Sequence, residues 1–588
     1  MSWLSYCYKT YQNSVSEIGK QQPGKVPLLP VAHTTQQVNI EVELDKDGNF
    51  QYAGLLAQDQ RTTIIPCTEE SSARTSGMVP HPLVDKLQYI AADYPTFGGS
   101  KESGWPLYHK QLQAWCTSPY AHPAVCTVLH YLEKECLIAD LVKANILFID
   151  ENGTLPTKWQ GNKEDKPPIL DTLTGSDQTE SFVRFRVDNV DLSRDTTVRE
   201  SFIRFYETQL KDIDYCTVQG IKMPISTLSP YKIRNPGDRA KLISSNDNTN
   251  YTYRGRFADA AQALSIGYET TQKAHSALRW LVSKQGVNTG DQTVLVWGTQ
   301  NEAVPNVLGD TLDIAQEYNP LAGDDWDDFE EDTERLPADT QEEIARQFNR
   351  AILGYQHQLK DNSQTAVMIL DSATPGRLSI RYYQELQGSK LLANIKDWHD
   401  AFQWQLEYRS VEEPTELGKK PKIKKVVFVG APAPADIAKA AYGEKVDAKL
   451  KQATIERLIP CITNGERFPR DLMISAVDRA TNSIGLDYWE QQKTQNIACA
   501  LVRGYYHRNK KVDYPMNVDE TIKDRNYLFG RILACAEQIE RRALIQLGNE
   551  SEKRLTNAER LRTAFALHPA ATTLLLDKKL TKFLIIFS

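Results

Sequence analysis

The order of apolar and polar positions predicts β structure first and helices soon after it. Apolar and polar residues alternate over 36–56, and the turn signal between Asp45 and Gly48 predicts a β-hairpin there. Apolar residues then recur at spacings of three and four, which is the period of an amphipathic helix. This period predicts helices in the segments 81–94, 107–116 and 124–141.

The next part of the chain predicts strands around one long helix. The polar segment 161–178 contains Pro and Gly and indicates a loop. A long helix is expected to end near Ser283, with Lys273, His275 and Arg279 away from the centre of its apolar stripe. The expected strands are 181–187, 240–245, 251–257 and 293–297.

Toward the C-terminus the pattern changes from mixed strands and helices to helices alone. After an acidic loop or linker at 319–340, a helix, two strands and a second helix follow, and the basic segment 419–425 indicates an exposed connector. The expected strands are 366–372 and 377–383, and the second helix lies around 397–406. From about residue 465, amphipathic stripes predict helices that pack as an antiparallel bundle. The stripes are Trp489, Ile497, Leu501 and Tyr505 in one helix and Leu528, Ile532, Cys535, Ile539 and Leu547 in the next.

We therefore expect an α+β fold, with mixed N-terminal and middle α/β regions and a C-terminal antiparallel helical bundle. A chain of 588 residues is too long for one compact core, so several domains are expected. The predicted divisions are 1–318 for an N-terminal α+β region, 319–340 for the acidic linker, 341–464 for a middle α+β region and 465–588 for the bundle.

Composition narrows the class of protein. The chain is 41% hydrophobic and 25% charged, like an ordinary globular protein. Its nine cysteines are scattered and form no C-x-x-C pair, which argues against a disulfide framework or a zinc ribbon and favours the cytoplasm. No export signal is expected at the N-terminus, and the apolar segment LTKFLIIFS is too short to span a membrane.

Charge is segregated along the chain. The net charge is -7, and residues 324–334 carry eight acids in eleven positions. From Met473 to the end there are 18 Lys and Arg against 13 Asp and Glu, a difference of +5. An acidic protein can therefore still present a basic surface.

The sequence contains no common catalytic motif. It has no phosphate-binding loop, no G-x-G-x-x-G turn, no H-E-x-x-H helix and no G-x-S-x-G elbow. His399 and Asp400 form an isolated His-Asp pair, and the contiguous acids of 324–334 lack the spacing of a metal site. We expect no enzymatic activity, no cofactor and no bound metal. A metal-dependent nuclease that uses His399 and Asp400, or acids of 324–334, is the alternative.

Three predicted strands interleave aromatic residues with arginines, and they are 181–187, 249–257 and 377–386. Guanidinium groups match phosphate oxygens, and aromatic faces accept unstacked bases. In the second strand Tyr251, Tyr253 and Phe257 share one face, while Arg254 and Arg256 share the other. This pattern favours nucleic-acid binding. The other interpretation is half-buried strands whose arginines are solvated or paired with carboxylates.

Several long segments resemble the large subunit of the type I-C CRISPR surveillance complex, Cascade. The resemblance extends over nearly the whole chain, in the expected order. The segments are RTSGMVPHPLVDKLQYI, KLISSNDNTNYTYRGRF, IGYETTQKAHSALRWLV, VLVWG, DSATPGRLSIRYYQEL, IACALVRGYY and RNYLFGRILACAEQIERRAL.

The resemblance implies a non-catalytic subunit that recognises a protospacer-adjacent motif in duplex DNA, helps to unwind it and stabilises the R-loop. In such complexes base pairing with the guide reads the sequence, while the protein checks the motif and the backbone. The implied partners are crRNA, target double-stranded DNA, the other Cascade backbone and crRNA-end-binding subunits, and a helicase-nuclease. A small subunit made from an internal start near Met473 is implied as well. The alternative within the binding class is a general scaffold for single-stranded nucleic acid.

The candidate site residues follow from the strand pattern and from this resemblance. Motif reading is expected from Arg74, Thr75, Ser76 and Gly77 and from Asn246 and Asn248, although turn formation also explains the two asparagines. Solvated charge is the alternative for each basic residue. The residues expected to bind nucleic acid are Arg184, Arg186, Lys241, Arg254, Arg256, Lys273, Arg279, Arg377, Arg381, Arg503, Arg508, Lys510, Lys511, Arg541 and Arg542.

Overall fold

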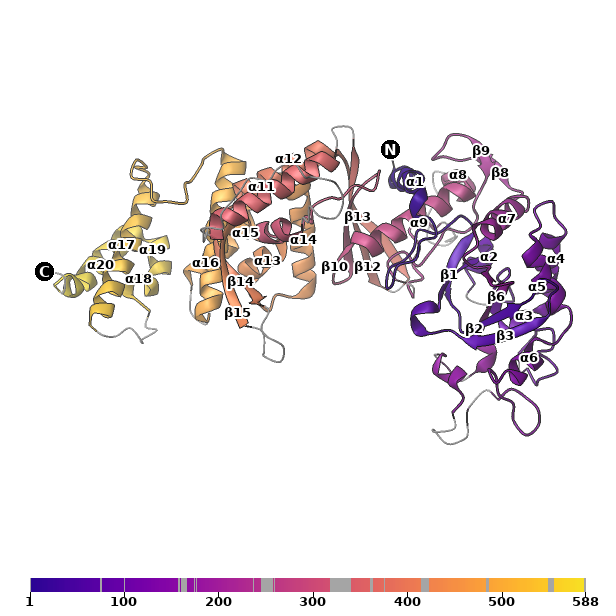
Figure 1. The fold of residues 1–588 in the computed structure, drawn as a ribbon. Helices are drawn as coiled ribbons and strands as arrows, with labels where there is room; N and C mark the ends of the chain where they lie inside the picture. Colours follow the sequence, from indigo (N-terminus) through magenta and orange to yellow (C-terminus); the bar gives the residue numbers. More distant parts are fainter. Residues whose placement is uncertain are drawn as a thin grey trace, which may run out of the picture. The chain divides into compact units, whose positions relative to one another are not determined.

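The fold is mixed α+β and is described from a computed structural model (Figure 1). The described residues are 2–74, 77–99, 101–156, 159, 166–173, 175, 177–235, 237–244, 257, 260–317, 340–359, 363–374, 376–413, 422–482, 486–547 and 555–585.

The chain forms two compact units, whose boundaries differ from the predicted divisions. The first unit comprises Met1–Gly286, Thr299–Asn301 and Leu370–Arg381, and the second comprises Val287–Gly298, Glu302–Ile369 and Tyr382–Ser588. Most of the predicted middle region therefore lies in one unit with the predicted bundle, whereas Leu370–Arg381 belongs to the first unit. The middle region and the bundle share one hydrophobic core, in which Trp398 and Leu391 are buried together with Leu472 and Leu501.

The first unit is built on a five-stranded sheet in the order β3-β2-β6-β5, with β7 paired to β6. The predicted hairpin is confirmed, because β2 and β3 pair antiparallel around the turn at Asp45. The predicted strand at 181–187 is also confirmed, as β6, and it runs parallel to β2. The strands are β2 (Ile40–Leu44), β3 (Phe50–Leu55), β5 (Asp85–Lys86), β6 (Phe182–Val187) and β7 (Val190–Asp191).

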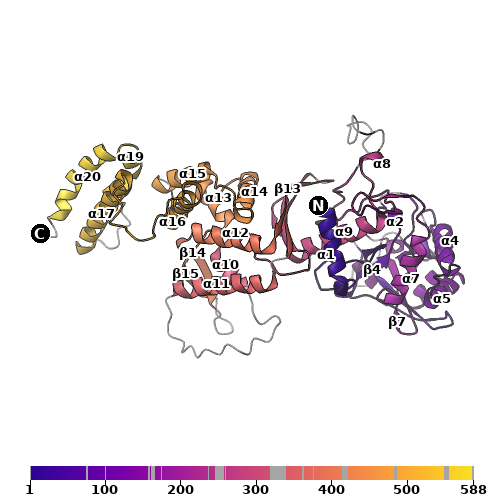
Figure 2. The same cartoon turned by 90° about the horizontal axis from the view of Figure 1, so that it is seen from above.

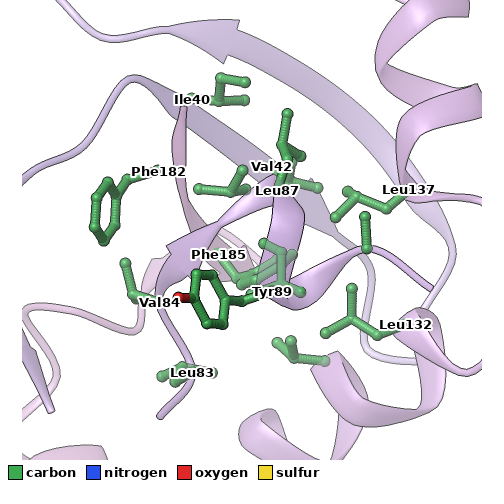
Figure 3. Close-up of a cluster of buried hydrophobic side chains, with 14 of the residues drawn as sticks. Ile40, Val42, Leu83, Val84, Leu87, Tyr89, Leu132, Leu137, Phe182 and Phe185 are labelled. Atoms are coloured by element: carbon green, nitrogen blue, oxygen red, sulfur yellow. The ribbon is translucent and has the colours of Figure 1, made fainter. Parts of the chain in front are cut away.

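Helices cover this sheet and enclose its core. Ile40 and Val42 of β2 and Phe185 of β6 lie in one buried cluster with Leu132 and Leu137 (Figure 3). The predicted helix at 81–94 is wrong in part, since that segment contains the short β5 and a single helical turn, α3. The helices are α3 (Leu87–Ile90), α4 (Trp105–Cys116), α5 (Pro123–Leu132), α6 (Leu137–Lys143) and α7 (Thr196–Glu207).

A long helix, α9 (Tyr268–Gln285), lies beside α1 (Trp3–Asn13) in both views of the chain (Figures 1 and 2). The predicted helix is confirmed, but its positions away from the apolar stripe are not all exposed. His275 is completely buried and Arg279 exposes 9% of its surface, because α1 packs against α9 and Trp3 meets the His275 ring edge-on. His275 and Arg279 are thus buried although they lie away from the centre of the apolar stripe.

The remaining elements of the first unit are short. The predicted strand at 240–245 is wrong for its described residues 240–244, which are irregular because Asp238 turns the chain and accepts a hydrogen bond from the Ala240 amide at 3.0 Å. Its predicted partner at 251–257 lies outside the described residues except for Phe257. The short elements are β1 (His33–Gln37), β4 (Thr62–Pro66), β8 (Ile213–Tyr215), β9 (Lys222–Pro224), α2 (Glu69–Ser72) and α8 (Ala260–Ala263).

The central part of the chain contains a four-stranded sheet in the order β10-β11-β12-β13 and a two-stranded sheet of β14 and β15. The predicted buried strand at 293–297 is confirmed within β11, and the strands at 366–372 and 377–383 within β12 and β13. The strands are β10 (Val287–Thr289), β11 (Gln292–Gly298), β12 (Gln364–Thr374), β13 (Arg377–Gln387), β14 (Trp404–Glu413) and β15 (Lys422–Gly430).

Five helices accompany these strands. The predicted helix around 397–406 is wrong at its end, since α12 stops at Ala401 and Trp404 begins β14. The basic connector at 419–425 is also corrected, because β15 already begins at Lys422. The acidic segment 319–340 lies outside the described residues, apart from Thr340 at the start of α11. The helices are α10 (Thr311–Glu317), α11 (Thr340–Gln358), α12 (Gly388–Ala401), α13 (Pro434–Tyr442) and α14 (Ala448–Thr463).

The regular elements among the described residues after 465 are all helices, as predicted. In α16 the predicted stripe is buried at Ile497, Leu501 and Tyr505, whereas Trp489 exposes 57% of its surface. The helices are α15 (Arg470–Thr481), α16 (Tyr488–Tyr505), a π-helical turn (Tyr506–Lys510), α17 (Arg525–Gln546), α18 (Asn557–Arg560), α19 (Arg562–Leu567) and α20 (Pro569–Leu584).

The predicted packing stripe of α17 is wrong in part, since Ile539 packs against a hydrophobic core but most of the stripe does not. Leu528, Ile532 and Leu547 expose 40%, 42% and 55% of their surfaces, and the buried positions include Ala536 and Ala543 instead. These alanines belong to a core with residues of α20, because a small side chain lets the second helix approach closely. Large apolar residues on α17 are thus left uncovered by the described part of the chain.

The stability of the second unit depends on pH through one buried histidine. His399 is 3% exposed, its Nδ1 lies 2.8 Å from Thr311 Oγ1, and its ring lies 4.9 Å from that of Phe348. Burial lowers the pKa of His399 to about 3. The folded unit therefore holds this ring neutral, while the unfolded chain protonates it near pH 6.5.

We expect the stability due to His399 to be complete above pH 6.5 and to be lost as the pH falls toward 3. Between pH 7 and pH 5 the free energy of unfolding should drop by about 2 kcal/mol through this group. Urea unfolding of the His399→Asn variant should show a correspondingly smaller loss over that interval. The same substitution at the exposed His568 is the control, and an equal loss in wild type and His399→Asn would contradict the assignment.

Candidate nucleic-acid interface

The two arginines of β6 are paired within the sheet. In the parallel register Arg184 lies opposite Glu41 and Arg186 opposite Glu43 of β2, so each pair points to the same face. Arg184 Nε donates to Glu41 Oε2 at 2.8 Å, and Arg186 Nε donates to Glu43 Oε2 at 2.7 Å. Arg184 is also only 5% exposed. The carboxylate-paired interpretation therefore describes this strand, and the geometry does not offer Arg184 to phosphate.

The other predicted strands contribute one exposed arginine. The side chain of Arg381 on β13 is 52% exposed and lies 3.6 Å from Asp371 Oδ2, where water screens the pair. The backbone of Arg377 lies in the same strand. Arg254 and Arg256, the most basic part of the pattern, lie outside the described residues, as do Thr75, Ser76, Asn246 and Asn248.

On α9 the predicted basic residues have different surroundings. Lys273 forms an ion pair with Glu269, and its ammonium lies 5.6 Å from the ring centre of Tyr8. Arg279 is buried, and its Nε has no hydrogen-bond partner. Lys241 lies half-buried in the irregular segment before the residues that are not described. Of the two predicted residues on α9, Arg279 is thus the one whose charge the described chain leaves uncompensated.

Two arginines predicted to follow the DNA path hold helix ends instead. Arg503 donates to the carbonyls of Asp400, Ala401 and Gln403 at 2.8, 3.0 and 3.3 Å. Arg508 donates to the Cys461 carbonyl at 2.8 Å in the last turn of α14, and it is 9% exposed. The last carbonyls of a helix have no partner inside the helix, so a buried guanidinium stabilises them. These two residues are structural.

The remaining predicted residues of the C-terminal helices are more accessible. Arg541 pairs with Glu559 at 2.9 Å and keeps a side chain that is 43% exposed. Lys510, Lys511 and Arg542 are exposed. Their charges therefore remain open to a polyanion.

Arg74 closes a loop. Its guanidinium donates to both carboxylate oxygens of Asp85, at 2.8 and 3.0 Å, and to the Val79 carbonyl at 2.9 Å. Asp85 is fully buried and also accepts the His81 amide at 2.6 Å. The loop between these residues, 75–84, hereafter the clamped loop, is fixed at its base. Gly77 stands in it with φ 87°, a conformation that favours glycine. The guanidinium of Arg74 thus holds the base of the loop.

A group of cations that the sequence analysis missed lies beside this loop. Arg279 and Arg239 both lower the pKa of Lys232, after the larger effect of burial, and Lys232 and Arg279 both act on Cys67. Lys232 also lowers the pKa of His81 in the clamped loop, after the larger effect of burial. We call Lys232, Arg239 and Arg279 the basic cluster. The sequence signal that could have identified this cluster is the segment YKIRNPGDRAK, which has four cations and one acid.

The nuclease alternative gains no support from the geometry. His399 is buried against Thr311, whereas Asp400 is exposed and accepts from Lys396 at 2.5 Å. Among the residues that the structure describes, no three His, Cys, Asp or Glu side chains gather as metal ligands. The acidic run lies outside those residues. Over the same residues, no helix is long and apolar enough to cross a membrane.

Replacing Arg184 by Gln should destabilise the first unit by about 3 kcal/mol, because Glu41 is left without its cation. DNA affinity measured well below the melting temperature should not change. Arg186→Gln is the matched control, with a smaller loss because its side chain is 30% exposed. Thermal melts and fluorescence anisotropy measure both effects. Weaker DNA binding at unchanged stability would show that Arg184 contacts phosphate after all.

Comparison with known proteins places the chain in one family. No curated protein matches the chain. The model of the family described as CRISPR-associated protein (Cas_Csd1) matches residues 7–585, which is nearly the whole chain. The chain therefore belongs to the Cas_Csd1 family of CRISPR-associated proteins.

Proposed function

We propose that this chain is the non-catalytic large subunit of a type I-C CRISPR RNA-guided surveillance complex. In this role it recognises the protospacer-adjacent motif in duplex DNA, helps to unwind the target and stabilises the R-loop. It also recruits the helicase-nuclease and contacts crRNA together with the other Cascade backbone and crRNA-end-binding subunits. The family match supports the class of protein, and one structural observation carries the specific role.

That observation is the clamped loop beside the basic cluster. A motif reader needs a segment that keeps its shape when it enters a groove, because ordering a flexible loop on binding costs affinity. The bidentate Arg74–Asp85 pair supplies such rigidity at the base of the loop. Cations that hold the phosphates nearby fix the orientation of the duplex, while the loop tip discriminates between base pairs.

The C-terminal helices support a second part of the proposal, the docking of small subunits. The described residues leave Leu528, Ile532 and Leu547 on α17 exposed, and these side chains are apolar. We propose that this part of α17 receives a copy of the C-terminal helices produced from the internal start at Met473. Met473 lies in the first turn of α15, so such a product would contain most of α15 and all later helices.

Substituting Met473 by Leu should remove the small C-terminal product and leave the full-length chain folded. Leucine has nearly the same volume as methionine, and such exchanges usually cost less than about 1.5 kcal/mol. Mass spectrometry of the purified complex detects the product. Ile474→Leu is the control at the neighbouring exposed position, which leaves the start codon intact. A small product that persists in Met473→Leu would contradict the internal start.

Replacing Asp85 by Asn should loosen the clamped loop, because an amide cannot neutralise Arg74. The ratio of affinities for targets with the preferred and with a scrambled flanking motif should fall about tenfold, which corresponds to about 1.4 kcal/mol. The assay compares crRNA-loaded complexes on matched targets that differ in the flank. Asp171→Asn, which breaks an exposed pair with Lys166, is the matched control.

Three results would contradict the proposal. Equal affinity for all flanks in the wild-type complex would favour a general single-strand scaffold. Cleavage of DNA by the purified chain with Mg²⁺ or Mn²⁺, lost in His399→Ala, would favour the nuclease. Unchanged discrimination in Asp85→Asn would show that another segment reads the motif.

A further inference from the structure

Arg279 carries a buried charge that no acidic side chain of the described residues balances. It exposes 9% of its surface, and its Nε makes no hydrogen bond. Burial lowers its pKa to about 10, so the guanidinium is still charged at neutral pH. Within the described part of the chain no carboxylate pairs with it. An unpaired buried ion is among the costliest groups a fold can hold, so the site calls for an anion.

The two ionisable groups that act on Arg279 cannot supply that anion. They are the thiol of Cys67 and the phenol of Tyr231. Burial raises the pKa of Cys67 to about 12 and also raises the pKa of Tyr231 above its ordinary value of 10. Both groups are therefore neutral at pH 7. They can accept or donate hydrogen bonds, but they leave the charge of Arg279 in place.

Two further cations stand near this charge instead of acids. Burial lowers the pKa of Lys232, and Arg279 lowers it further, as expected for like charges that are close together. The Lys232 backbone has φ 62°, a left-handed conformation that costs a non-glycine residue about 1 kcal/mol or more. The turn is closed by a hydrogen bond from the Lys232 amide to the Asp238 carbonyl at 2.9 Å.

The carboxylate of Asp238 is used elsewhere in the same turn. It lies 3.7 Å from Arg234 and accepts the Ala240 amide at 3.0 Å. Arg74, which also acts on Tyr231, is neutralised by Asp85. The three residues of the basic cluster thus keep their positive charges. Arg279 is buried, Lys232 is half-buried and Arg239 is exposed, so the cluster reaches the surface at Arg239.

We propose that Lys232, Arg239 and Arg279 form a phosphate site that takes one phosphodiester of the DNA backbone. This inference rests on the proposed function, and it adds the ligand chemistry and the residues that hold the ligand. The planar guanidinium of Arg279 presents two parallel donors that match two phosphate oxygens. Lys232 adds a point charge, Arg239 attracts the polyanion from solution, and the neutral hydroxyl of Tyr231 can donate a further hydrogen bond.

The location of the phosphate site suits it to positioning the DNA duplex. It lies beside the clamped loop, so a phosphate held there fixes the register of the duplex against the loop tip. A single buried contact of this kind positions DNA without reading its sequence. Affinity should therefore fall for every flanking motif alike when the site is lost.

The test uses the full chain and three glutamine variants, Arg279→Gln, Lys232→Gln and Arg239→Gln. Each variant should bind a short DNA duplex about tenfold more weakly, and the slope of log affinity against log salt should become shallower by about 1. Arg204→Gln on α7 is the control, since this arginine is exposed and outside the basic cluster. Because Arg239 is exposed, its variant keeps the test valid even if Arg279→Gln folds poorly.

A second measurement separates the phosphate site from a structural role. Inorganic phosphate should raise the melting temperature of the wild type above that in chloride at equal ionic strength, and it should not do so for Arg279→Met. In chloride alone Arg279→Met should be at least as stable as the wild type, because an uncompensated charge is removed. A variant that is equally destabilised in both salts would overturn the proposal, since a bound water or the protein itself would then satisfy Arg279.

The outcomes also distinguish this site from the proposed function. If the complex discriminates motifs but all three variants bind like the wild type, the phosphate site is wrong and the function stands. If the variants bind weakly but no motif is preferred, the site stands and the function falls. Stabilisation by free phosphate without any effect on duplex binding would mean that the site serves a free phosphate, and the proposal for DNA would be wrong.

Discussion

A guanidinium remains charged at any pH at which this protein folds, so each one that leaves water needs acceptors from the rest of the chain. Four arginines meet this requirement in different ways. Arg184 takes a carboxylate from the neighbouring strand and Arg74 a carboxylate from the far end of its own loop, whereas Arg503 and Arg508 take carbonyls at helix ends. The contacts of Arg184, Arg503 and Arg508 tie together segments that are distant in the sequence, and that of Arg74 closes a loop, which is why the arginines contribute to the fold.

The same requirement shows how far the sequence could predict the site. The alternation in SFVRFRV predicts β6 correctly, because alternation is a local property of a strand. It cannot tell whether Arg184 faces phosphate or a carboxylate, since Glu41 lies 143 residues earlier and meets it only in the folded sheet. Arg503 and Arg508 look like free charges for a similar reason: the carbonyls that they bind belong to other helices.

Packing between distant helices limited the other predictions. Large apolar residues dominate the pattern of α17, yet the face that packs contains Ala536 and Ala543, which admit a close neighbour. The stripe on α9 was identified, but a sequence pattern cannot show that α1 covers its other side and buries His275. Hairpins and single helices were predictable because their signals are local, whereas burial of the basic cluster depends on the tertiary structure.

The two ion pairs between β2 and β6 also constrain which substitutions this protein can accumulate. Glu41 faces Arg184 and Glu43 faces Arg186 in a fixed parallel register, so a change of charge on one strand leaves an unmatched ion on the other. Substitutions at these positions can accumulate only in step, for example as a joint exchange to apolar residues. Among descendants of this chain, the four sites should therefore co-vary in two couples, while the free cations of the C-terminal helices drift independently.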